Sequence, residues 1–177
     1  YGIIGLKTHC KIALVVRKED EKMKRYVHLS TGNYNQTTAK LYTDFGIFTA
    51  NEDFGKDATQ LFNYLTGYSK KHSYKELVVA PINMRKTILS LIDNEIKQQQ
   101  EHNNGYILAK MNSLVDEEVI LKLYEASNAG VKIELMVRGI CRLKPGVQGM
   151  SENINVYSLV GRFLEHSRAF YFNNNGN

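Results

Sequence analysis

The sequence has few cysteines and no long apolar segment, and these two absences exclude several classes of protein. Its two cysteines, Cys10 and Cys141, lie far apart and form no CxxC pair, so neither a disulfide-stabilised fold nor a cysteine zinc site is expected. No apolar run approaches the roughly 20 residues that cross a bilayer, and no signal peptide is visible. We therefore expect a protein of a reducing compartment, without a transmembrane segment.

The composition is that of a globular protein, with an uneven excess of positive charge. Hydrophobic residues make up 43% of the 177 residues, and the formal net charge is +5. Residues 1–50 carry eight Lys or Arg against four acids and residues 131–177 carry six against three, whereas residues 101–130 carry two against five. This excess at both ends favours an anionic partner, with nucleic acid, nucleotide and polyphosphate all open. Because the chain begins at Tyr1 rather than at Met, we expect a fragment of a longer protein.

The first part of the chain has the pattern of a small sheet with one helix. Its periodicities predict strands over residues 11–17, 24–30 and within 39–50, a polar loop over 30–39, and a helix over 57–67. The basic segment 68–75 has no periodicity and predicts a linker. We place the domain boundary inside it, between residues 72 and 73.

The second part alternates strands and helices. The pattern predicts strands over residues 76–80, 106–111 and 131–137, and helices over 81–100 and 116–129. Such an alternation predicts a mainly parallel sheet with right-handed crossovers. Ligands of parallel sheets bind at the carboxyl ends of the strands, which points to Lys110 and Arg138 as anion-binding residues.

One histidine motif occurs twice, once in each part. The segments "GLKTHCKIALVVR" and "GRFLEHSRAFYF" share the pattern apolar-x-x-His-x-(Lys/Arg) followed by an apolar run. In an extended chain, residues two apart point to the same face, so His9 lies beside Lys11 and His166 beside Arg168. Two parts that each contribute a histidine and a cation to one site favour a site for phosphoryl transfer.

The chemistry of phosphoryl transfer explains these residue types. A neutral imidazole can attack phosphorus near pH 7, because its ordinary pKa is about 6.5, whereas a serine needs a separate base. Lys11 and Arg168 would neutralise charge on the phosphoryl oxygens, and the second histidine could protonate the leaving oxygen. The other histidines, His28, His72 and His102, belong to no such motif, and we interpret them as structural or solvated.

Several long segments resemble the carboxyl-terminal half of the bacterial polyphosphate kinase family, the ATP-dependent type that works through a phosphohistidine. They are "GLKTHCKIALVVR", "YVHLSTGNYN", "LYTDFG", "LAKMNSLVD", "GVKIELMVRGICRLKPGV" and "SENINVYSLVGRFLEHSR". The resemblance covers essentially the whole chain. It implies an α/β fold class with phospholipase-D-like mixed sheets flanked by helices. It also implies two related, truncated domains: residues 1–72 as the C-terminal part of the first and 73–177 as the N-terminal part of the second.

The resemblance also implies roles for particular residues. His9 would be the phosphorylated nucleophile, and Tyr42, Arg138 and His166 would contact the nucleotide and its phosphates. Lys11, Lys110 and Arg168 would be further cations of the site. The implied partners are ATP, ADP and polyphosphate rather than nucleic acid, with Mg²⁺ bound by residues upstream and no metal site in this chain. For the full-length protein, the resemblance implies a cytoplasmic homo-oligomer, and it leaves open a peripheral association with the inner membrane. We expect the fragment alone to have little activity.

The sequence departs from ordinary phospholipase-D enzymes at one position. Their motif has an acidic residue seven positions after the histidine, where this chain has Val16 and Asn173. An acid that orients each histidine is therefore missing at that spacing, which argues against the first alternative, a phospholipase-D-type phosphodiesterase. A second alternative is a non-catalytic fragment that binds polyanions.

Overall fold

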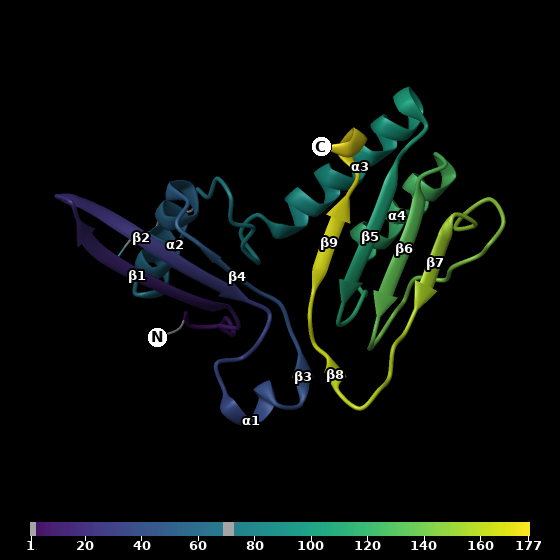
Figure 1. Cartoon of the computed structure of the whole chain (residues 1–177). Coiled ribbons are helices and arrows are strands. Elements are labelled where there is room, and N and C mark those ends of the chain that lie inside the picture. The colour runs from purple at the N-terminus through teal and green to yellow at the C-terminus, as the bar shows by residue number, and fades with distance from the viewer. Residues whose placement is uncertain (1–2, 69–72) are drawn as a thin grey trace.

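The computed structural model describes residues 3–68 and 73–177, which form two halves that lie side by side (Figure 1). In the first half, an antiparallel sheet in the order β1-β2-β4 packs against helix α2. Its elements are β1 (Lys11–Glu19), β2 (Lys22–Ser30), β4 (Gly46–Thr49) and α2 (Glu52–Leu65). Asp20 and Glu21 join β1 to β2 with positive φ at both positions, the conformation whose twist matches that of an antiparallel hairpin.

The second half is a four-stranded sheet with two helices on one face. The sheet has the order β7-β6-β5-β9, in which β5, β6 and β7 are parallel and β9 runs antiparallel to β5. The elements are α3 (Met84–His102), β5 (Tyr106–Met111), α4 (Glu117–Asn128), β6 (Lys132–Val137), β7 (Ile154–Tyr157) and β9 (Ala169–Phe172). The predicted parallel alternation of strands and helices is thus present from β5 to β6.

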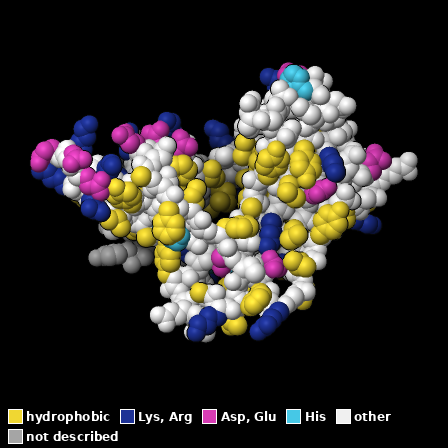
Figure 2. Space-filling model, viewed as in Figure 1, with side chains coloured by type: hydrophobic (Ala, Val, Ile, Leu, Met, Phe, Trp, Pro, Cys, Tyr) yellow, Lys and Arg dark blue, Asp and Glu magenta, His cyan; other side chains and the backbone are white. Residues whose placement is uncertain are grey.

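The core of the second half lies between the sheet and the helices. Ile92 of α3, Ile107 of β5 and Ile133 of β6 are each 2% exposed or less. Side chains that alternate with these core residues along the strands point to the opposite face of the sheet. On that face Leu108 of β5 lies opposite Tyr171 of β9, and both are half exposed. Figure 2 shows hydrophobic side chains gathered over this part of the molecule.

The sequence-based boundaries needed several corrections. Residues 76–80 form no strand. Helix α3 begins at Met84 rather than at Pro81, because a turn precedes the helix. In this turn the Asn83 side chain accepts a hydrogen bond from the Val79 N–H (2.6 Å). The strand expected within 39–50 is two short strands, β3 (Tyr42–Thr43) and β4. The polar loop over 30–39 contains the short helix α1 (Gln36–Ala39). Helix α2 begins at Glu52, because Asn51 caps its first turn.

The two halves are joined by a short parallel ladder. Strand β3 of the first half pairs with β8 (Leu164–Glu165) of the second, with Tyr42 opposite Leu164 and Thr43 opposite Glu165. A 3₁₀ turn, Asn174–Gly176, follows β9 and packs against α3. The predicted domain boundary between residues 72 and 73, and His72 itself, fall at a segment outside the described residues. In the described part of the chain, no helix is both long and apolar enough to span a membrane.

A buried carboxylate fixes the chain where the second half begins. Asp57 of α2 is 3% exposed, and its Oδ2 accepts hydrogen bonds from the backbone N–H groups of Lys75, Glu76 and Leu77 at 2.7–2.9 Å. Within residues 76–80, the N–H groups of Glu76 and Leu77 donate to Asp57 and that of Val79 donates to Asn83, so side chains take bonds that a ladder would use.

Replacing Asp57 with Ala is expected to loosen this segment. Three buried or half-buried donors lose their acceptor, which costs about 1–3 kcal/mol, so amide exchange at residues 75–77 should accelerate on the order of 10- to 100-fold. Hydrogen exchange followed by mass spectrometry measures this. Glu52→Ala removes an exposed acid of the same helix and should leave these amides unchanged; equal protection in both variants would contradict the assignment.

Candidate functional site

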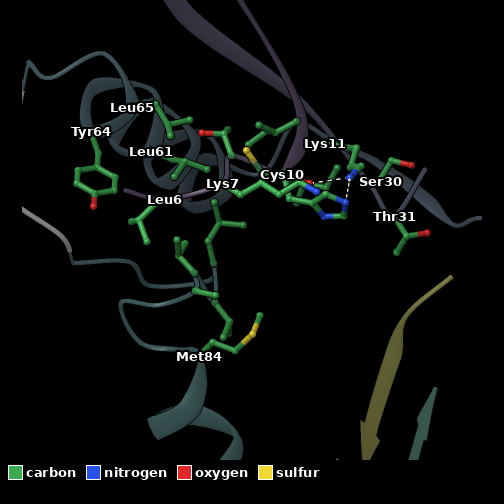
Figure 3. A pocket seen from close by; sticks show the side chains of 18 of the residues that line it. Leu6, Lys7, Cys10, Lys11, Ser30, Thr31, Leu61, Tyr64, Leu65 and Met84 are labelled. Carbon is green, nitrogen blue, oxygen red and sulfur yellow. Dashed lines mark hydrogen bonds between the residues drawn. The ribbon is translucent and has the colours of Figure 1, made fainter. Parts of the chain in front are cut away.

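The first histidine motif leads directly into β1 and brings its histidine and lysine into contact. The Lys11 ammonium donates to His9 Nε2 (3.0 Å) and to the His9 backbone oxygen (2.7 Å), as the dashed lines of Figure 3 show. An ammonium has only donors, so Nε2 must accept and the ring is neutral with its proton on Nδ1. The prediction that His9 and Lys11 lie side by side is therefore confirmed.

The surroundings keep the His9 ring uncharged. Loss of surrounding water is the main cause that lowers the pKa of His9, and the positive charges of Lys11, Arg168 and Lys7 and the interaction with His166 lower it further. The pKa of Lys11 is also lowered, by desolvation and by the charge of Arg168. The second motif therefore lies close enough to act electrostatically on the first, although 157 positions separate the two histidines in the sequence.

Removing the Lys11 charge is expected to raise the pKa of His9. In Lys11→Met the ring loses a neighbouring cation, so it should take up a proton at higher pH than in the parent protein. An NMR titration of histidine-labelled protein, assigned with His9→Gln, measures this shift. Lys18→Met removes a lysine that pairs with Glu21 at the far end of β1 and should not move the titration; an unchanged His9 pKa in Lys11→Met would contradict the electrostatic account.

The second histidine is buried and oriented by an acid from the first half. His166 follows β8, is 6% exposed, and its Nδ1 lies 2.7 Å from Asp44 Oδ1. Its backbone N–H donates to Thr43 O (3.2 Å), and its ring lies 5.0 Å from that of Tyr42. Asp44 itself accepts from the Thr31 hydroxyl (2.7 Å). The β3–β8 ladder thus places Asp44 against His166.

The sequence did not single out this acid as a site residue. The acid that ordinary phospholipase-D enzymes carry seven residues after the histidine is missing here, yet Asp44 reaches His166 from 122 residues upstream. The one sequence signal that pointed toward Asp44 was its place in the segment "LYTDFG", two residues after the predicted site residue Tyr42.

The other predicted cations differ in what they contact. Arg168 donates to the backbone oxygen of His166 (3.3 Å) and is half-buried. Lys110 of β5 is paired with Glu165 (2.6 Å) and Ser167 (2.6 Å). Arg138 follows β6 as predicted and is half-buried, and among the described residues its side chain has no ion pair or hydrogen bond.

The remaining histidines have local contacts. His28 lies 2.8 Å from the Tyr34 hydroxyl and is stacked on Phe48, and His102 ends α3 beside Glu101. In the described residues no three His, Cys, Asp or Glu side chains gather closely enough to hold a metal ion.

A largely apolar cavity of about 780 Å³ lies next to His9, between the two halves. The segment that leads into β1 lines it from one side and includes His9 and Lys11. Leu61 and Leu65 of α2 contribute to its wall (Figure 3). Residues 77–81, the first of which donates its N–H to Asp57, close it from the second half. A neutral imidazole and adjacent cations thus lie at the mouth of a cavity large enough for a small ligand.

Two family models match consecutive parts of the chain. The family model "Polyphosphate kinase C-terminal domain 1" matches residues 1–71, and "Polyphosphate kinase C-terminal domain 2" matches residues 77–177. The polyphosphate kinases of Halalkalibacterium halodurans and Bacillus cereus are 60% and 58% identical to this chain over 176 residues, which is 99% of the chain and 25% of each relative. The chain therefore spans about a quarter of the length of the curated relatives that it matches.

A solved structure has the same fold. The crystal structure of polyphosphate kinase from Porphyromonas gingivalis superposes with a TM-score of 0.89 at 44% identity, covering 100% of this chain and 29% of that chain. The expected α/β fold with phospholipase-D-like sheets is thereby confirmed. The two family models, the identities and the superposition all show that this chain belongs to the polyphosphate kinase family.

Proposed function

We propose that the full-length protein transfers the γ-phosphoryl group of ATP reversibly to inorganic polyphosphate, through a phosphohistidine at His9. The observation that carries this proposal is the contact of 3.0 Å between the Lys11 ammonium and Nε2 of a neutral His9. A neutral imidazole is a nucleophile, and adjacent cations suit a substrate that is a polyanion. The names of the relatives support the same activity.

In the proposed first step, the His9 Nε2 lone pair attacks the γ-phosphorus of ATP. A nitrogen–phosphorus bond forms, the bond from phosphorus to the bridging oxygen breaks, and its electron pair leaves on ADP. The Lys11 ammonium moves from Nε2 to a phosphoryl oxygen. The ring keeps its proton on Nδ1 and carries the positive charge gained at Nε2 until the phosphoryl group leaves. In the second step, a terminal oxygen of polyphosphate attacks the same phosphorus and restores His9.

The second half supplies the group that acts on the leaving oxygen. We propose that His166, with its Nδ1 held by Asp44, presents Nε2 to the leaving phosphate oxygen as a proton donor. Arg168 and Arg138 bind phosphate oxygens, and Tyr42 packs against His166 and contacts the nucleotide. Lys110, predicted as a further phosphate-binding cation, is paired with Glu165 in the absence of substrate.

Mg²⁺ is proposed as the ion that accompanies ATP, but the described residues do not fit a site for it. Among residues 3–68 and 73–177 no three suitable ligands gather, and Asp44 and Glu165 are engaged by His166 and Lys110. We therefore place the metal ligands elsewhere in the full-length protein. A cytoplasmic homo-oligomer, with ATP, ADP and polyphosphate as partners, completes the proposal.

Incubation of the full-length protein with γ-labelled ATP tests this function. We expect label on the protein that is stable in base and labile in acid, as for a phosphoramidate, and its transfer to polyphosphate. Release of diester products without ATP would support a phosphodiesterase instead. Strongly salt-dependent binding of polyphosphate without labelling would indicate a non-catalytic polyanion-binding protein.

A further inference from the structure

The Lys110 ammonium binds the residues on both sides of His166. It donates to Glu165 Oε2 (2.6 Å) and to Ser167 Oγ (2.6 Å). These contacts place the side chains of residues 165 and 167 together on one side of the chain, whereas the His166 ring contacts Asp44. A lysine that holds both neighbours therefore fixes the backbone so that the His166 ring points away from it, toward Asp44.

Glu165 extends this contact across the two halves. Its Oε2 also accepts from the Thr43 hydroxyl (2.9 Å), and Thr43 directly precedes Asp44. The Thr43 backbone oxygen in turn accepts from the N–H groups of His166 and Ser167 at 3.2 and 2.8 Å. One carboxylate thus connects β3, which directly precedes Asp44, to β8, which directly precedes His166.

The contacts of Lys110 differ from those of the other cations of the site. The Lys110 and Glu165 side chains are only 21% and 19% exposed, and the hydrogen bond from Lys110 is the main cause that lowers the pKa of Glu165. By contrast, Arg138 has no ion pair among the described residues, and Lys11 contacts a neutral ring. A cation whose charge is already balanced by a carboxylate attracts a phosphate weakly.

We propose that Lys110 and Glu165 are positioning residues that set the orientation of His166, rather than phosphate ligands. This inference rests on the proposed function, because the orientation of His166 matters only if that ring acts in the transfer. The pair keeps the β3–β8 ladder in register, and the ladder holds the Asp44 carboxylate against His166 Nδ1.

The kinetics of Lys110→Met in the full-length protein test the proposal. Loss of the ammonium releases both neighbours of His166, so kcat for polyphosphate synthesis should fall by up to about 100-fold. The KM for ATP should change less than about twofold, because no phosphate contact is removed. Lys110→Arg, which can still bridge Glu165 and Ser167, should recover much of the loss.

A double-mutant cycle separates positioning from general stability. In a His166→Ala background, Lys110→Met should cause no further loss of kcat, since there is no ring left to orient. Ser167→Ala, which removes only one of the two contacts, should give a smaller loss with the same unchanged KM. Lys122→Met is the matched control, because Lys122 is similarly exposed (24%) and pairs with Asp93 and Glu125 away from the site.

Three results would overturn the proposal. The first is a raised KM for ATP with unchanged kcat in Lys110→Met, which would mark Lys110 as a phosphate ligand. The second is a full, additive loss of kcat when Lys110→Met is made in the His166→Ala background. The third is a loss of kcat in Lys122→Met equal to that in Lys110→Met, which would mark a stability effect. If the unmodified full-length protein forms no polyphosphate from ATP, the proposed function itself fails, and that result is seen before any variant is compared.

Discussion

Replacing His9 with Gln is expected to abolish labelling of the full-length protein by γ-labelled ATP and the synthesis of polyphosphate with it. Glutamine keeps a polar side chain of similar reach, but its amide has no basic nitrogen lone pair that could attack phosphorus. The Lys11 ammonium that now contacts His9 Nε2 would still be present to bind the nucleotide. The KM or binding constant for ATP should therefore change much less than the rate of transfer.

The matched control for this variant is His102→Gln. His102 ends α3 beside Glu101 and belongs to neither histidine motif, so its replacement should leave labelling at the level of the parent. Both proteins are treated with labelled ATP, divided, and exposed to acid or base before the retained label is counted. Equal base-stable labelling of the His9→Gln protein would show that another residue carries the phosphoryl group.

Replacing Asp44 with Asn is expected to lower the rate of phosphoryl transfer by roughly 10²- to 10⁴-fold. The carboxylate accepts from His166 Nδ1 and stabilises the protonated ring, whereas an amide can present its N–H to Nδ1 and favour the other tautomer. His166 would then be a neutral ring with its only proton on Nε2, and this ring is a much weaker acid than the protonated ring that the Asp44 carboxylate stabilises. Because Asp44 contacts neither ATP nor polyphosphate in this proposal, the loss should appear in kcat rather than in KM.

A second measurement distinguishes this role from a structural one. In a His166→Ala background, Asp44→Asn should cause little further loss, because the two residues act as one unit. Asp93→Asn serves as the control, since Asp93 is an exposed acid of α3 that pairs with Lys122. Independent, additive losses from Asp44→Asn and His166→Ala would contradict the assignment of Asp44 as the residue that orients His166.

The parts of this protein that the sequence predicted well depend on local spacing. Strands β1, β2, β5 and β6 and helices α3 and α4 were expected close to their observed bounds, because apolar periodicity reflects the burial of one face. The contact between His9 and Lys11 was predicted for the same reason, since residues two apart in an extended chain share a face. The elements that were misplaced, at residues 76–80 and at β3 and β4, are those whose hydrogen bonds go to distant partners such as Asp57 and β8.

By itself, the sequence determined the alternation of strands and helices, the two histidine motifs, and the resemblance that pointed to the polyphosphate kinase family. Each of these is a property of residues close together along the chain. Only the tertiary structure decided that Asp44 orients His166 and that Lys110 is paired with Glu165, because these contacts join residues 122 and 55 positions apart. A two-residue ladder between β3 and β8 creates the first of them, and so short a pairing leaves no periodic signal in the sequence.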